Sequence, residues 1–268
     1  MSQQGSRLAA RRCLLVGGTG GLGLATARRF LEEGARLVLA GHEVQAGRSA
    51  EQALNAADRC RFVLVEATQP ESVQQLFVEA IQFLGGLDVL YHLAGASGRR
   101  YGDGPLHACT DEGWQHTLSV NLTSVFLTNR AAIRHFLSVQ QPGVILNLAS
   151  VLAWSPAPHF FNTCAYAAAK GGIISLSRLA AASYADRGIR VNVLAPGLID
   201  TPMASRAVND PAIAAYLRSK QPLAQGAGRS VDCAEAAVFL CSEESAFLTG
   251  VVLPVDGGWC VSEGQYCQ

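Results

Sequence analysis

Tyr166 and Lys170 stand four residues apart in the segment Tyr-Ala-Ala-Ala-Lys. Residues at positions i and i+4 share one face of a helix, so a helix here places the lysine ammonium beside the tyrosine phenol. A phenol has an ordinary pKa of about 10, and a neighbouring cation lowers that pKa by stabilising the phenolate. The pair therefore predicts a side chain that exchanges a proton with a bound substrate.

A second motif with chemical meaning is the segment Gly-Gly-Thr-Gly-Gly-Leu-Gly at residues 17–23. It contains the spacings Gly-x-Gly-x-x-Gly and Gly-x-x-x-Gly-x-Gly. Between a strand and a helix, such a turn lets the backbone approach a pyrophosphate, which binds at the positive N-terminal end of the helix. No Gly-Lys-Ser/Thr follows, which disfavours a Walker-type loop. The segment predicts a dinucleotide site that includes Gly17, Thr19, Gly20, Gly21, Leu22 and Gly23.

The residues after the second expected strand bear on which dinucleotide is bound. An acidic residue usually binds the adenosine ribose hydroxyls at this position, whereas this chain has Gly41, His42 and Glu43. Gly41 leaves room for a 2′-phosphate and His42 is placed to contact it, while Glu43 is an alternative partner for the hydroxyls. The pattern slightly favours NADP over NAD, and an exposed loop histidine without a ligand is the simpler interpretation of His42.

Two further polar residues complete a set that suits acid–base chemistry. Ser150 ends the fifth expected strand, where sites on parallel sheets lie, and Asn121 lies in the helix before that strand. A hydroxyl, a phenol, an ammonium and an amide suffice for proton transfer at a carbonyl or a carbinol. Each residue alone has a structural explanation, so the prediction depends on the whole set.

Composition and charge disfavour other classes of protein. Of the 268 residues, 49% are hydrophobic and 16% are charged, which predicts a large core rather than disorder. The 21 basic and 21 acidic residues balance, so electrostatics favour neither nucleic acid nor an anionic membrane as partner. No apolar run has the length of a membrane span, and the first residues do not resemble a signal peptide. We expect a cytoplasmic protein with free thiols and no metal site.

Short apolar runs alternate with longer helical patterns, which predicts βαβ units and a parallel sheet. We expect a doubly wound, Rossmann-like α/β fold with seven strands in a single domain over residues 1–268, including a less regular substrate loop at about 196–229. The expected strands are 13–16, 36–40, 61–65, 87–92, 143–149, 189–195 and 251–255. The expected helices are 21–33, 43–57, one that begins near Pro70, 112–139 and 164–187.

In this order, the motifs resemble those of the short-chain dehydrogenase/reductase family in its compact single-domain form, from about residue 13 to residue 259. The resemblance is carried by Gly17-x-x-x-Gly21-x-Gly23, Leu93-Ala94-Gly95, Asn121, Ser150, Tyr166-x-x-x-Lys170, Ala195-Pro196-Gly197, Thr201-Pro202-Met203 and Leu253-Pro254-Val255-Asp256-Gly257-Gly258.

The resemblance implies an NAD(P)-dependent oxidoreductase that transfers a hydride between the nicotinamide and a secondary alcohol or ketone. Tyr166 would exchange the proton with the substrate oxygen, and Ser150 would orient that oxygen. Lys170 would bind the nicotinamide ribose and lower the pKa of Tyr166, while Asn121 would hold a water beside Lys170. Further implied cofactor contacts are Gly41, His42, Ala67, Thr68, Ala94, Gly95, Tyr166, Lys170, Pro196, Gly197, Ile199 and Thr201.

Three positions depart from the family pattern. Val16 replaces a threonine, and His92 and Leu93 replace two asparagines. The usual polar residues tie neighbouring strands together, so we expect an apolar contact between Val16 and Leu93 instead, and His92 as a buried structural residue with backbone partners. Glu66 replaces an aspartate after the third strand, where adenine contact is expected from the backbone of Ala67.

Other interpretations stay open at this stage. The aromatic-rich loop 151–165 forms a wall of the substrate pocket or packs against another subunit, and Trp259 raises the same alternative. Arg99 and Arg100 are better explained as solvated charges than as ligands of an anionic substrate. A dehydratase or epimerase on the same scaffold, or an idle dinucleotide sensor, are the rival functions. The family habit implies a homodimer or homotetramer formed through helices 112–139 and 164–187.

Overall fold

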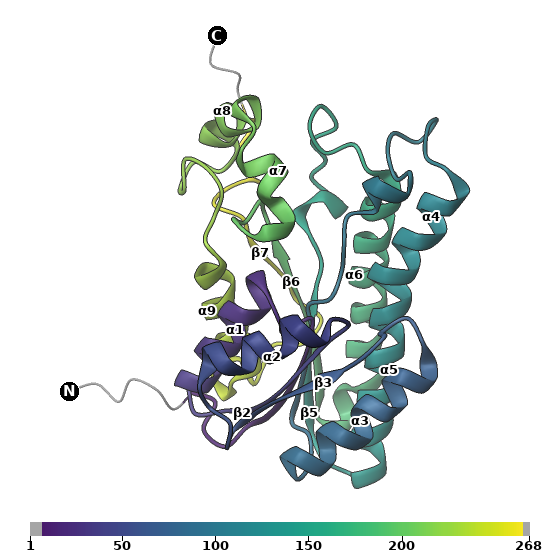
Figure 1. The fold of residues 1–268 in the computed structure, drawn as a ribbon, viewed down its shortest axis with the longest axis vertical. Coiled ribbons are helices and arrows are strands. Elements are labelled where there is room, and N and C mark those ends of the chain that lie inside the picture. The colour runs from purple at the N-terminus through teal and green to yellow at the C-terminus, as the bar shows by residue number, and fades with distance from the viewer. Residues whose placement is uncertain (1–6, 265–268) are drawn as a thin grey trace, which may run out of the picture.

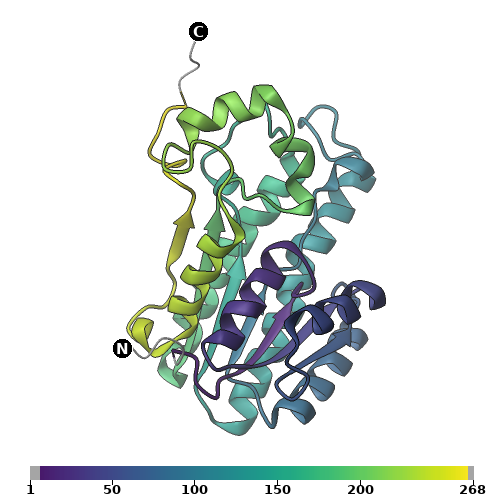
Figure 2. The same cartoon turned by 60° about the vertical axis from the view of Figure 1, so that its left-hand side comes forward.

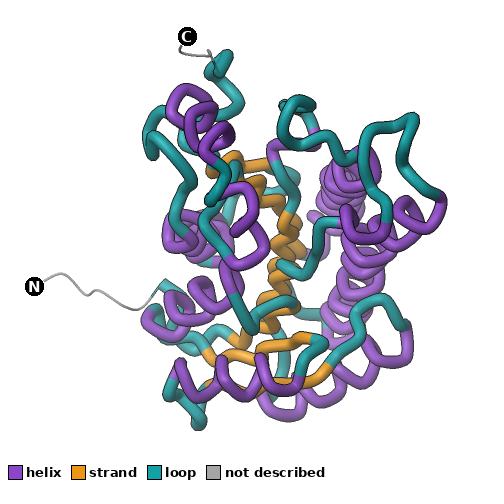
Figure 3. The backbone as a smooth tube through the Cα atoms, turned by 45° about the horizontal axis from the view of Figure 1, so that its top comes forward, coloured by secondary structure: helices purple, strands orange, loops and turns teal. Residues whose placement is uncertain are grey.

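The computed structural model describes residues 7–264. Within them, seven strands form one parallel sheet in the order β3-β2-β1-β4-β5-β6-β7, and Figure 3 shows helices on both sides of the strands. This confirms the expected doubly wound α/β fold. The strands are β1 Arg12–Val16, β2 Arg36–Gly41, β3 Cys60–Leu64, β4 Val89–His92, β5 Gly143–Leu148, β6 Ile189–Pro196 and β7 Val252–Val255.

The helices agree with most of the expected ranges to within a few residues. They are α1 Gly21–Glu32, α2 Val44–Leu54, α3 Pro70–Leu84, α4 Asp111–Leu118, α5 Ser124–Val139, α6 Cys164–Tyr184, α7 Ser205–Val208, α8 Pro211–Lys220 and α9 Ser230–Cys241. The predicted long helix over 112–139 is present as one uninterrupted helical run, in which a π-helical turn, η2 Ser119–Thr123, lies between α4 and α5. The stretch 196–229 is more regular than expected, since it contains α7 and α8.

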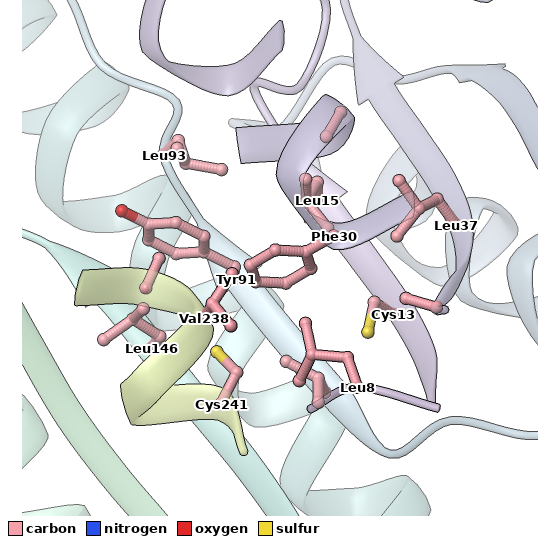
Figure 4. Packing of buried hydrophobic residues seen from close by; sticks show 14 of the residues in the cluster. Leu8, Cys13, Leu15, Phe30, Leu37, Tyr91, Leu93, Leu146, Val238 and Cys241 are labelled. Carbon is pink, nitrogen blue, oxygen red and sulfur yellow. The ribbon is translucent and has the colours of Figure 1, made fainter. Parts of the chain in front are cut away.

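Two apolar clusters bury the two faces of the sheet. One packs α1, α2 and α9 against β1, β2 and β4, and Figure 4 shows part of it, with Phe30 beside Tyr91 and Val238. The other packs α3, α5 and α6 on the opposite face. Successive residues of β1 serve the two clusters alternately, Leu14 on one side and Leu15 on the other. The strand is therefore apolar on both sides, as helices on both faces require.

The chain order reverses between β1 and β4, which are adjacent in the sheet. Connections leave these two strands in opposite directions, so a crevice forms at their carboxyl ends. The helices α7 and α8 extend beyond the ends of β6 and β7 (Figures 1 and 2). No helix in the described part of the chain is long and apolar enough to cross a membrane.

Candidate active site

The glycine turn joins β1 to α1 at this crevice. Gly17 has a φ of +89° and lies so close to the start of the next loop that a Cβ would be 2.6 Å from the Ala94 nitrogen. A Cβ on Gly23 would be 2.1 Å from the Gly17 oxygen. Gly20 begins α1 without a side-chain cap, and no described residue other than its own chain neighbours has a heavy atom within 4 Å of its Cβ position. The N-terminus of α1 is thus open, which fits a pyrophosphate.

Exposed polar groups surround the end of β2. His42 and Glu43 are both exposed, and the His42 Nε2 lies 3.4 Å from the Glu43 carboxylate. Gly41 is buried beneath Thr19, because a Gly41 Cβ would be 2.9 Å from the Thr19 Cγ2. The space over Gly41 is therefore partly filled by the glycine turn itself, and His42 and Glu43 are the groups that face outward.

The residue after the third strand, Glu66, is held locally. Thr68 donates to its carboxylate from the backbone nitrogen at 3.1 Å and from Oγ1 at 2.6 Å. These hydrogen bonds, the Oγ1 bond first, lower the pKa of Glu66. Ala67, the expected backbone contact for adenine, lies between two residues that this hydrogen bonding fixes.

The contact between the ends of the paired strands β1 and β4 differs from the apolar contact that we expected between Val16 and Leu93. Val16 and Leu93 are both buried, but Val16 belongs to the cluster on the α3 side and Leu93 to the cluster on the α1 side. Val16 is in register with His92, so the following residue points to the other face. The Val16 carbonyl instead accepts backbone hydrogen bonds from Leu93 at 2.8 Å and Ala94 at 2.9 Å. Backbone hydrogen bonds, rather than an apolar contact, join the strands here.

His92 is buried, as predicted, and its ring contacts hydroxyl groups. Its Nδ1 lies 2.8 Å from the Thr128 Oγ1 and its Nε2 lies 3.3 Å from the Ser124 Oγ. The predicted backbone partner is present as well, at Ala94. Burial first, and then the charge of Lys170, lower the pKa of His92 to about 3, so the ring is neutral. It fastens α5 to β4 beneath the site.

Asn121 lies in the π-helical turn and faces the loop after β4. Its Nδ2 donates to the carbonyls of Ala96 and Thr117, each at 2.9 Å, and its Oδ1 accepts from the Ala96 nitrogen at 3.2 Å. A Cβ on Gly95 would be 2.7 Å from the Asn121 Oδ1 and 3.3 Å from the Lys170 Nζ. The amide and the ammonium therefore converge on Gly95. Single π turns inside helices are frequent at functional sites.

Ser150, Tyr166 and Lys170 come together at the end of β5. Ser150 lies close enough to the Tyr166 hydroxyl to lower the pKa of the phenol. Lys170 is 2% exposed, its Nζ donates to the Leu148 carbonyl at 2.9 Å, and the same nitrogen lies 5.4 Å from the centre of the Tyr166 ring. The structure thus brings together the four residues that the sequence singled out for acid–base chemistry.

Burial decides the protonation of this pair. It raises the pKa of Tyr166 to about 12, and the nearby Ser150 offsets only part of that effect. Burial also lowers the pKa of Lys170 to about 8. The expected lowering of the tyrosine pKa by Lys170 is wrong for this structure, because the ammonium is directed at the Leu148 carbonyl and desolvation of the phenol dominates.

Asp103 positions the helix that carries Tyr166, a role that the sequence did not reveal. Its Oδ1 accepts the backbone N–H of Ala165 and its Oδ2 accepts that of Tyr166, both at 3.0 Å. Thr163, the residue next to the start of α6, makes no side-chain cap. The cap comes from a loop far away in sequence, so no local signal announces it.

Gln221 anchors the segment 196–201, and the sequence did not reveal it either. Its Oε1 accepts the Leu198 N–H at 2.6 Å, and its Nε2 donates back to the Leu198 carbonyl at 3.1 Å. At the end of this segment, the Thr201 Cβ lies 3.4 Å from the Cβ position of Gly21. The segment that contains Pro196, Gly197, Ile199 and Thr201 therefore reaches the glycine turn.

Aromatic residues from the loop 151–165, from α8 and from the C-terminal segment pack together. The Trp259 ring lies 5.8 Å from Phe161 and 5.9 Å from Tyr216, and Phe160 lies 5.1 Å from Tyr216. Trp259 is 1% exposed, so it packs within its own chain. Arg99 is exposed and donates to the Phe160 carbonyl at 3.2 Å. The loop 151–165 therefore packs against α8 and Trp259.

Comparison with known proteins agrees with this geometry. A family model described as enoyl-(acyl carrier protein) reductase matches residues 17–260. The chain is 37% identical over 262 residues to 3β-hydroxysteroid dehydrogenase 1 of Eggerthella lenta, with 96% of each chain covered. It is 36% identical over 255 residues to cis-4-hydroxycyclohexanecarboxylate dehydrogenase of Sinomonas cyclohexanicum, with 95% of this chain and 98% of the relative covered. The crystal structure of levodione reductase is similar with a TM-score of 0.86 at 28% identity, covering 93% and 97% of the two chains.

A wholly parallel sheet with an open glycine turn, together with a Ser–Tyr–Lys group at its carboxyl edge, defines a nicotinamide-dependent oxidoreductase. The matches extend over nearly the whole chain, and the chain belongs to the short-chain dehydrogenase/reductase family. It is a dehydrogenase/reductase that uses NAD or NADP.

Proposed function

We propose that Tyr166 is the general acid and base for oxidation of a secondary alcohol and for the reverse reduction of a ketone. The observation that carries this proposal is the placement of Ser150 near the Tyr166 hydroxyl and beside the buried Lys170, at the crevice where α1 begins uncapped. Ser150 orients the substrate oxygen towards the phenol. The bound nicotinamide supplies the hydride acceptor or donor.

Lys170 and Asn121 have supporting roles in this proposal. Lys170 binds the nicotinamide ribose and, with a pKa near 8, passes a proton on after Tyr166 has exchanged one. Asn121 holds the water that connects Lys170 to solvent, since its Oδ1 and the Lys170 Nζ both lie close to Gly95. The π-helical turn is what aims the amide at this point.

The cofactor contacts extend along the carboxyl edge of the sheet. The pyrophosphate lies at the glycine turn, the adenosine end lies near His42 and Thr68, and the segment 196–201 covers the nicotinamide. NADP is the preferred dinucleotide in this proposal, supported by the exposed imidazole of His42. Glu43, next to His42, is the feature that would favour NAD.

The substrate is proposed to be a cyclic secondary alcohol or the corresponding ketone. Two of the relatives are named for a 3β-hydroxysteroid and for a hydroxycyclohexanecarboxylate. Phe160 and Phe161 are partly exposed aromatic residues, and Phe161 packs on the buried Trp259, so these two rings are suited to contact a saturated ring. We further propose that residues 1–268 act as one domain, with 196–229 as its substrate loop, in a cytoplasmic homodimer or homotetramer.

Replacing Tyr166 with phenylalanine tests the central role. Y166F keeps the ring and removes the exchangeable proton, so we expect kcat to fall by about 10² to 10⁴, with the cofactor dissociation constant unchanged. Y184F is the matched control, because Tyr184 ends the same helix, and it should keep its activity. Turnover that survives in Y166F would show that the proton route is wrong.

The same assay separates the rival functions. A dehydrogenase accumulates one reduced cofactor per alcohol oxidised, which absorbance follows directly. An epimerase or dehydratase on this scaffold shows no steady-state accumulation. A dinucleotide sensor binds cofactor with no turnover for any alcohol in a panel of cyclohexanols and 3β-hydroxysteroids.

A further inference from the structure

Asp103, Cys109 and Cys164 form a compact cluster at the start of α6, and neither cysteine has a part in the proposed chemistry. One carboxylate oxygen and the two Sγ atoms all lie within 4.8 Å of one another. Both cysteines are free and partly exposed, while Asp103 is 4% exposed. The sequence did not predict this cluster, because Cys164 at the start of α6 lies far along the chain from Asp103 and Cys109, and the three residues lack any short ligand spacing.

Hydrogen bonds to the backbone hold the three residues in place. They leave lone pairs of the Asp103 carboxylate available to a ligand. Each Asp103 oxygen accepts a single N–H from α6, and a carboxylate has about four acceptor sites in total. The Cys164 nitrogen donates to the Gly104 carbonyl at 3.0 Å, and the Cys109 nitrogen donates to that of Pro105 at 2.9 Å. Hydrogen bonds of this kind orient the ligands in metal sites.

The Asp103 carboxylate of the cluster has no close cation. Among residues 7–264, no lysine or arginine nitrogen lies within 4.0 Å of the Asp103 carboxylate. A divalent cation would offset the charge of this carboxylate and bind the two cysteines as thiolates.

We propose that Asp103, Cys109 and Cys164 bind a thiophilic divalent cation of the zinc type, with water as the fourth ligand. Zinc forms tetrahedral sites with bonds of about 2.3 Å to sulfur and about 2.0–2.2 Å to a carboxylate oxygen. Such bonds place two sulfurs about 3.8 Å apart, so the three groups need to move only about 1 Å. Thiolate ligands select soft metals over magnesium and calcium. Two thiol protons leave to solvent as the ion binds.

Zinc retention by the reduced full-length chain tests the proposal. All proteins carry Cys267→Ser, so that the thiol outside the described residues does not compete. After chelator treatment and dialysis against Zn²⁺, we expect one zinc per chain by elemental analysis, with at least about tenfold weaker binding in C109S and in C164S. C260S is the matched control, since Cys260 is also a partly buried thiol beside a carboxylate, Asp256, but has no second cysteine.

Co²⁺ provides a second readout, because a thiolate–cobalt charge-transfer band should appear in the Cys267→Ser protein and in C260S but not in C109S. Circular dichroism of the metal-free proteins shows that each variant is folded. Zinc binding by C109S and C164S as tight as that of the parent protein, or no retained zinc in the parent protein, would overturn the proposal. A further outcome would overturn it: protein that retains no zinc but has two fewer titratable thiols, which a reductant restores. That result would identify Cys109 and Cys164 as a disulfide pair.

Discussion

At the scale of single residues, the protonation of Tyr166 and Lys170 is set by desolvation. Burial holds Tyr166 as a phenol, with a pKa of about 12, and brings the pKa of Lys170 to about 8. The protein groups of the site therefore do not by themselves make the phenol acidic. Further positive charge near the phenol, which the oxidised nicotinamide carries, is required for proton release in the proposed reaction.

The buried ammonium of Lys170 should cost stability at neutral pH. Its pKa is about 8 when folded and about 10.4 when unfolded, so the folded state is penalised below pH 8 and the penalty disappears as the pH rises to about 10.5. K170M should therefore be more stable than the parent protein at pH 7, by about 1–3 kcal/mol, although inactive.

Urea unfolding of K170M and the parent protein at several pH values from 7 to 10 measures this difference. The gap should shrink towards pH 10, and Tyr166 does not disturb the comparison because both proteins contain it. A variant that is less stable at pH 7, or a gap that is independent of pH, would contradict the account.

His42 bears on the choice of cofactor. If it contacts a 2′-phosphate, H42A should raise the KM for NADP roughly two- to fivefold, the range of an exposed ionic contact, and leave the KM for NAD unchanged. H107A removes another exposed histidine, in a loop away from β2, and serves as the control. Equal effects on both cofactors would remove the support for NADP.

At the scale of elements, the site depends on departures from regular structure. The π-helical turn aims Asn121 at Gly95, and the tight glycine turn leaves the start of α1 without a cap. In each case a local irregularity directs polar groups into the crevice at the carboxyl ends of the strands.

Two glycines of this turn should respond differently to alanine. G23A places a Cβ against the Gly17 oxygen, so it should lose about 1–3 kcal/mol of stability. Gly20 has an extended backbone with a φ of −160°, and the space around its Cβ position is open. The stability of G20A should therefore differ from that of the parent protein by less than about 0.5 kcal/mol. The added methyl group would occupy the pyrophosphate position.

Thermal unfolding with and without NADP separates the two effects. G20A should unfold like the parent protein without cofactor but gain less from saturating NADP. Full stabilisation of G20A by the cofactor would place the pyrophosphate elsewhere.

At the scale of the whole molecule, the outer faces of α5 and α6 carry apolar side chains. Leu179 on α6 is 66% exposed and Phe126 on α5 is 41% exposed, which supports the proposed association through these helices. L179K should lower the mass of the assembly measured by light scattering after gel filtration. L106K changes an exposed leucine in a loop outside these helices and should leave the mass unchanged. An unchanged mass in L179K would argue against this interface.

The sequence by itself determined the strands, the glycine turn and the identity of the Ser–Tyr–Lys–Asn set, because apolar periodicity and turn chemistry are local properties of the chain. Only the tertiary structure decided the π-helical turn, the cap that Asp103 provides and the anchor at Gln221. It also decided the pKa values of Tyr166 and Lys170, and the backbone link that replaced the expected contact between Val16 and Leu93. The physical reason is that desolvation, strand register and long-range hydrogen bonds depend on which segments meet in space, and spacing along the chain does not encode that directly.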